Sequence, residues 1–335
     1  MDSHRFRIKD KGDIMKEIGG YFGLEQTKGD KEFYNNLISL NTARNALVYL
    51  VKAKGISKLY IPYYLCDSIS CVLDREFIKY DFYHINDSFF PILDYTLHSD
   101  EYIYIVNYYG LLSNEEVIEL KNKYHNVILD NTHSFFQEPL DNVDTIYSCR
   151  KFFGVPDGAY LSTNIKLNES LDVDDSSERM KHIFGRVKDG ASVHYNEFKE
   201  TDDSFYNLNL KYMSNLTHSL LKNIDYDYVI KTRKSNFTFL NKKLNLINKI
   251  DVSNVDIPFA YPLYLSNGIN IRKELIKEKI YIPTLWPNVI GIGGIEEDYA
   301  MNILPIPCDQ RYDFKDMDFI ASLILNKVGV EKNDL

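Results

Sequence analysis

The sequence predicts an α/β fold: a large three-layer domain built on a mostly parallel sheet, followed by a smaller α/β C-terminal domain. Two observations support it. Short apolar segments alternate with helical patterns between residues 40 and 162, as in βαβ units. After about residue 165 helical stretches dominate, and strand signals return only near residues 260 and 280. We therefore expect an N-terminal arm and a large domain over residues 1–235, and a small domain over residues 236–335.

Helix and strand signals of the large domain alternate along the chain. Asn41 or Thr42 can cap a first helix, in which apolar residues follow at helical spacing up to residue 51. Ser113 and Glu116 form a capping-box pattern before a helix at 114–124. Another helix is expected at 67–74. Strands are expected at residues 58–64, 77–83, 102–110, 126–130, 145–148 and 160–162.

The second half of the chain is mainly helical. Helices are expected at 178–186, 215–223, 226–244 and 316–328, and strands at 260–265 and near 280–283. Near the N-terminus, the glycine-rich aromatic segment 18–24 suggests a turn that lies against another surface.

Composition and charge exclude several classes of function. The net charge of −9 argues against a nucleic-acid-binding protein, which needs a basic surface. The four cysteines are scattered and include no CxxC pair, which favours reduced cysteines of a cytoplasmic protein over a disulfide framework or a metal site. No apolar signal segment opens the sequence, and no apolar run approaches the roughly 20 residues of a membrane span. We expect no membrane partner.

Polar residues follow several of the expected strands. Tyr64, Asn107, Asp130 and Lys151 all fall at or just after the carboxyl end of a strand. Ligands of parallel sheets collect beyond these ends. The sequence therefore predicts one binding site along this edge of the sheet.

Lys151 is the candidate catalytic residue of this edge. A lysine amine can hold a carbonyl cofactor covalently, and a carboxylate such as that of Asp130 can keep the ring nitrogen of a pyridine cofactor protonated. Each residue has a plainer interpretation, as a surface lysine in a loop and as a cap of the next helix. His133 either bonds the phenolic oxygen of the cofactor or is a satisfied, partly buried histidine.

A phosphate of the cofactor would need donors of its own. The helix that begins after Asn41 and Thr42 offers free backbone N–H groups and the positive end of its dipole, although an ordinary N-cap explains the same pattern. Ser148 can add a hydroxyl. Arg44 or Arg311 could bind a carboxylate or phosphate in bidentate fashion, and each could equally be a surface arginine.

Several motifs together resemble the DegT/DnrJ-type sugar aminotransferases, a family of fold-type I pyridoxal-phosphate enzymes. The matching segments are Asn41-Thr42-Ala43, Val106-Asn107-Tyr108-Tyr109-Gly110, Leu129-Asp130-Asn131-Thr132-His133, and Ser148-Cys149-Arg150-Lys151 with Pro156-Asp157-Gly158. The resemblance covers most of the chain and is most specific over residues 126–161. It implies the large and small domains of the type I pyridoxal-phosphate transferase fold.

The resemblance also implies a cofactor, pyridoxal 5'-phosphate, and a role for each matching residue. Lys151 matches the lysine that forms the Schiff base, Asp130 the partner of the pyridinium nitrogen, and His133 the contact of the phenolic oxygen. Thr42, Ala43 and Ser148 match the residues around the phosphate. Asn41 and Asn107 belong to the matching segments and are expected to bind the cofactor as well. Tyr63 or Tyr64 would stack on the ring, with Tyr64 our choice.

The implied function is transfer of an amino group from an amino acid, glutamate or glutamine, to a keto-sugar or a small phosphorylated ketone. The implied context is bacterial surface-polysaccharide biosynthesis by a homodimer with its site at the interface. Two departures leave alternatives open: the serine–lysine spacing is short, and Pro156-Asp157-Gly158-Ala159 replaces a glycine-rich motif. The alternatives are a decarboxylase or aldolase with the same cofactor, or a non-catalytic sugar-binding relative.

Overall fold

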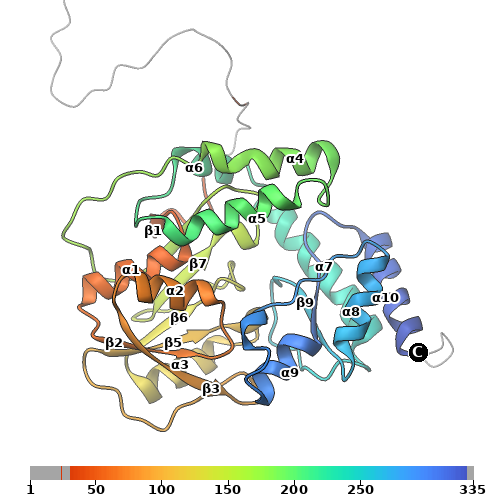
Figure 1. Cartoon of the computed structure of the whole chain (residues 1–335), viewed down its shortest axis with the longest axis horizontal. Helices are drawn as coiled ribbons and strands as arrows, with labels where there is room; N and C mark the ends of the chain where they lie inside the picture. Colours follow the sequence, from red (N-terminus) through yellow and green to blue (C-terminus); the bar gives the residue numbers. More distant parts are fainter. Residues whose placement is uncertain (1–23, 25–30, 330–335) are drawn as a thin grey trace, which may run out of the picture.

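A computed structural model describes Leu24 and residues 31–329 of the chain (Figure 1). The segment at residues 18–24 therefore lies, apart from Leu24, outside the described residues. Within them, no helix combines the length and the apolar character that crossing a membrane requires.

An eight-stranded sheet forms the centre of the large domain, in the order β1-β8-β7-β6-β5-β2-β3-β4. The five strands from β7 to β3 run parallel, whereas β8, β1 and β4 pair antiparallel with their neighbours. The mostly parallel sheet is thus confirmed. The strands are β1 (Ile38–Leu40), β2 (Lys58–Pro62), β3 (Lys79–Ile85), β4 (Pro91–Ile92), β5 (Glu101–Val106), β6 (Val127–Asp130), β7 (Asp144–Ser148) and β8 (Ala159–Ser162).

Helices α1 (Ala43–Lys54), α2 (Asp67–Arg75) and α3 (Asn114–Tyr124) begin where the sequence predicts. Thr42 caps α1 by accepting the amide of Asn45, and Ser113 and Glu116 form the expected capping box of α3. Helix α1 packs on β7 and β8, and α3 packs on β6. The apolar faces of these helices and the sheet form the main core.

Four helices connect the sheet to the C-terminal part: α4 (Lys181–Asp189), α5 (Tyr195–Ser204), α6 (Asn215–Lys222) and α7 (Tyr226–Leu244). Helices α4 and α5 lie side by side (Figure 1). Short 3-10 turns occur at Tyr108–Gly110, Cys149–Lys151, Ser177–Met180, Phe205–Asn207 and Pro287–Val289.

A second apolar core gathers α7, the antiparallel pair β9 (Tyr261–Tyr264) and β10 (Ile303–Ile306), and helices α8 (Gly268–Lys277) and α10 (Phe314–Val328). Helix α9 (Gly294–Asn302) lies between α8 and β10 and also contacts β3 of the large sheet. The proposed division at residue 235 falls within α7.

The expectation of a strand near residues 280–283 is wrong. These residues, all of them described, form no strand. The left-handed backbone of Lys279 (φ 62°) ends the helical turn, and Pro283 has no N–H to donate to a ladder. Conversely, β10 was not expected; its Pro305 pairs with Pro262 of the expected strand β9. A two-stranded ribbon leaves one edge unpaired and so tolerates the missing donor.

Candidate active site

The carboxyl ends of the parallel strands bring the predicted residues to one edge of the sheet. Asn107 follows β5 directly, Asp130 is the last residue of β6, and Ser148 is the last residue of β7. Lys151 ends the 3-10 turn that leaves β7. The parallel direction of the three strands therefore places these three strand ends side by side.

Lys151 is exposed, and its Nζ atom lies 5.8 Å from the centre of the Phe259 ring. The residues after it are buried: Phe152 and Phe153 are 3% and 5% exposed. Lys151 thus projects from a turn that is anchored in the core by its two aromatic neighbours. An exposed amine on an anchored turn can reach a ligand at this edge.

Asp130 is a buried carboxylate with defined partners. Its Oδ2 atom accepts the hydroxyl of Tyr104 at 2.7 Å, and its Oδ1 atom accepts the amide of Thr132 at 2.8 Å. Burial raises the pKa of Asp130, whereas these two hydrogen bonds and the charge of Lys151 lower it. The positive charge of Lys151 therefore acts on Asp130 across the site.

His133 lies between two aromatic rings and lacks a partner for one nitrogen. Its ring stacks on Phe259 with a centroid distance of 4.1 Å and on Trp286 with 5.5 Å. The buried Nδ1 atom has no hydrogen-bond partner among the described residues. Burial lowers the pKa of His133 well below its usual range, and the charge of Lys151 lowers it further, so the ring is neutral.

The expected phosphate end lies at the start of α1. The first N–H groups of a helix have no partner inside it, and Ala43 and Arg44 occupy these positions. Ser148 is 9% exposed, and its hydroxyl makes no hydrogen bond to a residue that the structure describes. Donors are thus available where the motifs predict a phosphate.

The side chain and the backbone of Asn41 form hydrogen bonds with other residues of the protein. Its amide group donates to the backbone oxygen of Asn209 and to Asp174, and its side-chain oxygen accepts from Asn45. Its backbone bonds Lys211 and Gly158. Asn41 therefore fixes the approach to α1 and has no free donor for a ligand.

The side chain of Asn107 likewise forms hydrogen bonds with other residues of the protein. It is fully buried, donates to Asn131 and Gln137, and accepts the amide of Leu112. These bonds hold the turn after β5. Asn107 supports the edge of the sheet and offers a ligand no unused donor.

Both candidates for ring stacking are packed against other side chains. Tyr64 is fully buried, with its ring at 4.4 Å from Trp286 and 5.3 Å from Tyr108. Tyr63 stacks on Phe82 at 4.7 Å. The choice of Tyr64 stays a prediction.

Asp157, in the segment that replaces the glycine-rich motif, has a structural role. Its carboxylate accepts the amide and the hydroxyl of Ser214 and the hydroxyl of Thr217 at the start of α6. Ser214 is the N-cap residue of α6. The N-terminus of α6 is thereby fixed to the loop that follows Lys151.

Three neighbours of the site were not predicted from the sequence: Tyr104, Phe259 and Trp286. Trp286, the single tryptophan, lies in a left-handed backbone conformation (φ 53°) that costs energy for a residue with a side chain. Its uniqueness and its position before Pro287 could have indicated a special role. Nothing in the local sequence distinguishes Phe259 from a core residue.

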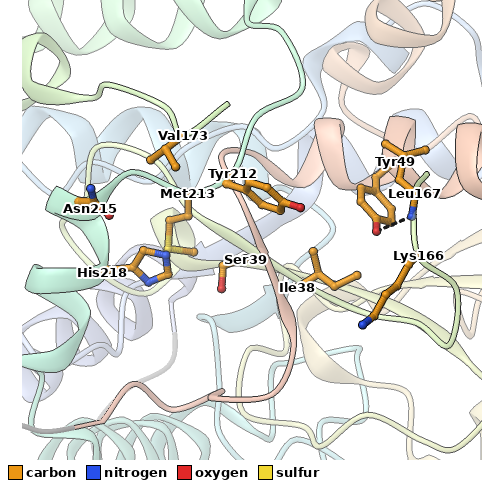
Figure 2. Close-up of a pocket in the computed structure, with 10 residues that line it drawn as sticks. All are labelled: Ile38, Ser39, Tyr49, Lys166, Leu167, Val173, Tyr212, Met213, Asn215 and His218. Carbon is orange, nitrogen blue, oxygen red and sulfur yellow. Dashed lines mark hydrogen bonds between the residues drawn. The ribbon is translucent and has the colours of Figure 1, made fainter. Parts of the chain in front are cut away.

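A pocket of about 430 Å³ lies elsewhere, between β1 and the segment 212–218 (Figure 2). Tyr49 accepts the amide of Leu167 beside it. None of the residues predicted to bind the cofactor lines this pocket. It is separate from the candidate active site.

Comparison of the sequence with protein-family models finds no match, and no curated protein matches it either. The structure does match solved structures. A DegT DnrJ EryC1 StrS aminotransferase from Brucella abortus has 14% sequence identity and a TM-score of 0.58, covering 88% of this chain and 86% of that chain. NtdA from Bacillus subtilis, solved with bound cofactor PMP, has 13% identity and a TM-score of 0.62, covering 88% and 73%.

The sugar aminotransferase CalS13 from Micromonospora echinospora is similar as well, with 12% identity, a TM-score of 0.57 and coverage of 88% and 87%. At these identities the likeness shows the fold. The chain therefore has the α/β fold of type I pyridoxal-phosphate transferases, as its motifs predicted.

Proposed function

We propose that this protein is a pyridoxal 5'-phosphate-dependent aminotransferase. The observation that carries the proposal is the cluster of Lys151, Asp130 and His133 at the carboxyl edge of a sheet with the aminotransferase fold. Asp130 and His133 come from one motif and Lys151 from another, and the charge of Lys151 acts on both other residues. A surface lysine in an ordinary loop would have no such neighbours.

The residues present fit the cofactor. The unpartnered Nδ1 atom of buried His133 can bond a phenolic oxygen, and Asp130 can hold a ring nitrogen protonated. The start of α1 and the free hydroxyl of Ser148 suit a phosphate. When bound, the cofactor supplies an electron-withdrawing ring that stabilises negative charge on the substrate's α-carbon.

Lys151 has two tasks in this proposal. Its amine would hold the cofactor through the aldehyde, and the same amine would move a proton at the substrate's α-carbon as base and acid. The anchored turn keeps the amine within reach throughout.

The proposed amino donor is glutamate or glutamine, and the proposed acceptor is a keto-sugar or a small phosphorylated ketone. The names of similar structures, such as CalS13, a sugar aminotransferase, support a sugar acceptor. We further propose a cytoplasmic homodimer with the site at its interface, acting in bacterial surface-polysaccharide biosynthesis.

A half-reaction tests the proposal. Protein loaded with pyridoxal 5'-phosphate and mixed with glutamate or glutamine should lose the absorption of the aldehyde form, gain that of the amine form, and release a keto acid. Lys151→Ala should abolish the reaction, whereas Lys188→Ala, which removes an exposed lysine of α4, should leave it unchanged. Release of carbon dioxide without a keto acid would identify a decarboxylase instead.

A further inference from the structure

Three arginines from different parts of the chain surround the ring of Phe205. The guanidinium carbons of Arg150, Arg179 and Arg44 lie 3.9, 5.6 and 6.0 Å from its centroid. Phe205 is fully buried at the end of α5, so the three cations share one apolar centre. Stacking on one ring brings like charges close together.

The carboxylates nearby do not balance these charges. Arg179 bonds Asp174 at 2.6 Å, and Arg150 bonds the half-exposed Asp202 at 3.3 Å. Arg44 makes no ion pair or hydrogen bond to any residue that the structure describes, and its Nη1 atom is buried. The Nε atom of Arg179 is likewise buried without a partner. Two arginines thus retain buried donors that nothing in the described chain accepts.

The start of α1 adds to the positive potential. Arg44 is the second residue of this helix, where the dipole favours a negative charge, and the first turn contains no acidic residue. Burial lowers the pKa of Arg150, and the charges of Arg44 and Arg179 lower it further. A positive helix end with three guanidinium groups is the arrangement that an anion would stabilise.

We propose that Arg44, Arg150 and Arg179, together with the first amides of α1, form a binding site for a phosphate monoester. A doubly charged tetrahedral anion accepts from several directions at once, which suits donors on three separate segments better than a planar carboxylate does. The phosphate belongs either to the cofactor or to a phosphorylated substrate. The first of these sources rests on the proposed function.

This arrangement explains the short spacing between Ser148 and Lys151. Arg150 stands between Ser148 and Lys151, and its guanidinium reaches Phe205 while Lys151 remains exposed on the same turn. The backbone oxygen of Asn209 accepts from Asn41 and Asn45, so that segment braces the start of α1. The donors of the phosphate site all come from one chain.

The first measurement is the affinity for pyridoxal 5'-phosphate and for pyridoxal, followed by absorbance in the parent protein and in Arg44→Gln. We expect the variant to bind the phosphate form at least tenfold more weakly, because charged hydrogen bonds are lost, and to bind pyridoxal as the parent does. Arg186→Gln, which removes the same charge from an exposed position of α4, should change neither affinity.

The second measurement is the melting temperature in inorganic phosphate and in chloride of equal ionic strength. Phosphate should stabilise the parent and Arg186→Gln, stabilise Arg44→Lys less, and leave Arg44→Gln unchanged. In chloride alone Arg44→Gln should melt no lower than the parent, because a repulsive charge has been removed. This comparison also shows that the variant is folded.

The outcomes distinguish the two sources of the phosphate, the cofactor and a phosphorylated substrate. They also distinguish a failure of the phosphate site from a failure of the proposed function. A selective loss of pyridoxal 5'-phosphate affinity assigns the site to the cofactor. Loss of phosphate stabilisation with unchanged cofactor affinity assigns it to a phosphorylated substrate. If Arg44→Gln alters neither measurement, the phosphate site is overturned, even where the cofactor still labels Lys151. If no cofactor binds but phosphate stabilises through Arg44, the proposed function fails and the site stands.

Discussion

Asp130 and His133 show how single residues of the site depend on their surroundings. Asp130 is held by Tyr104 and Thr132, and burial raises its pKa, whereas His133 is kept neutral by burial. Burial causes both effects; the nearby charge of Lys151 adds to the effect at His133 and opposes it at Asp130. A cofactor with a basic ring nitrogen would meet a carboxylate and a neutral imidazole on the same edge.

Asp130→Asn should separate activity from stability. We expect the half-reaction to slow by about 100-fold or more, because the ring nitrogen loses its charged partner. The melting temperature should hold or rise, since a buried charge is removed. Asp144→Asn is the matched control: this buried residue of β7 bonds Lys54 at 2.9 Å, so its loss should lower the melting temperature without slowing the reaction.

Glu32 gives a prediction for pH. Burial raises its pKa, but hydrogen bonds with His218 (2.7 Å) and Tyr160 outweigh burial and lower it below its usual value of 4.5. Because the folded value is the lower one, Glu32 stabilises the fold above pH 4.5, and this stabilisation is lost as the pH falls further.

Glu32→Gln should therefore cost about 1–2 kcal/mol of unfolding free energy at neutral pH, and the difference should shrink in acid. Urea unfolding at a series of pH values measures it. A difference that stays constant across the acidic range would contradict the account.

Some residue assignments could be predicted from the sequence and others could not. Lys151, Asp130 and His133 follow strands whose order the apolar pattern indicates. The internal hydrogen bonds of Asn41 and Asn107 could not be predicted, because their partners, among them Asp174 and Asn209, lie far away in the chain. Local sequence does not show whether a polar residue already has hydrogen-bond partners within the protein.

At the scale of elements, the loop between β7 and β8 positions the turn of Lys151. Gly158 has a positive φ of 114°, and its amide bonds the backbone oxygen of Asn41 at 2.7 Å. A Cβ atom there would lie 3.0 Å from Thr217 and 3.2 Å from Cys149. The loop is thus packed closely against Thr217 of α6 and bonded to the residue before the cap of α1.

Gly158→Ala should destabilise the protein by about 1–3 kcal/mol, through backbone strain together with these contacts. Gly55→Ala is the control, because Gly55 also has a positive φ (65°) but nothing lies within 4 Å of its Cβ position. Denaturant midpoints compare the two. An equal loss in both variants would mean that the packing around Gly158 contributes nothing.

Helices with clear local signals were found, whereas the strand expected near residues 280–283 is absent and β10 was missed. The caps of α1 and α3 are encoded within four residues, so their starts were predictable. Strand β10 contains a proline and pairs only with β9, which lies about forty residues earlier in the chain. Its existence depends on that distant partner, which no local pattern shows.

At the scale of the whole molecule, Arg233 of α7 connects the second core to the turn of Lys151. It is 2% exposed and donates to the backbone oxygens of Phe152, Pro258 and Phe259 and to the side chain of Gln310. Gln310 donates to the same oxygen of Phe152. The C-terminal part thereby holds the residue next to Lys151.

Arg233→Met should lower the unfolding free energy by about 3 kcal/mol, since several carbonyl groups lose a charged donor inside the protein. Arg233→Lys should restore little, because an ammonium group cannot reproduce the planar fork. Chemical denaturation followed by tyrosine and tryptophan signals checks both variants. Full recovery of stability by lysine would show that charge alone matters.

The whole-molecule features were the least predictable. The alternation of strands and helices was enough to predict the parallel sheet and the edge that its strand ends share, because both depend on the order of elements along the chain. The arginines around Phe205 and the rings around His133 come from segments up to about 160 residues apart. Such contacts depend on how the elements pack and not on their sequence patterns.

The central claim is that Lys151 holds pyridoxal 5'-phosphate. Incubation of the full chain with the cofactor, reduction with borohydride and peptide mapping by mass spectrometry test it most directly. We expect a yellow protein and one reduced pyridoxyl-phosphate group, attached to Lys151 and absent from Lys151→Ala. A colourless protein, or a label spread over exposed lysines and unchanged in Lys151→Ala, would contradict the claim.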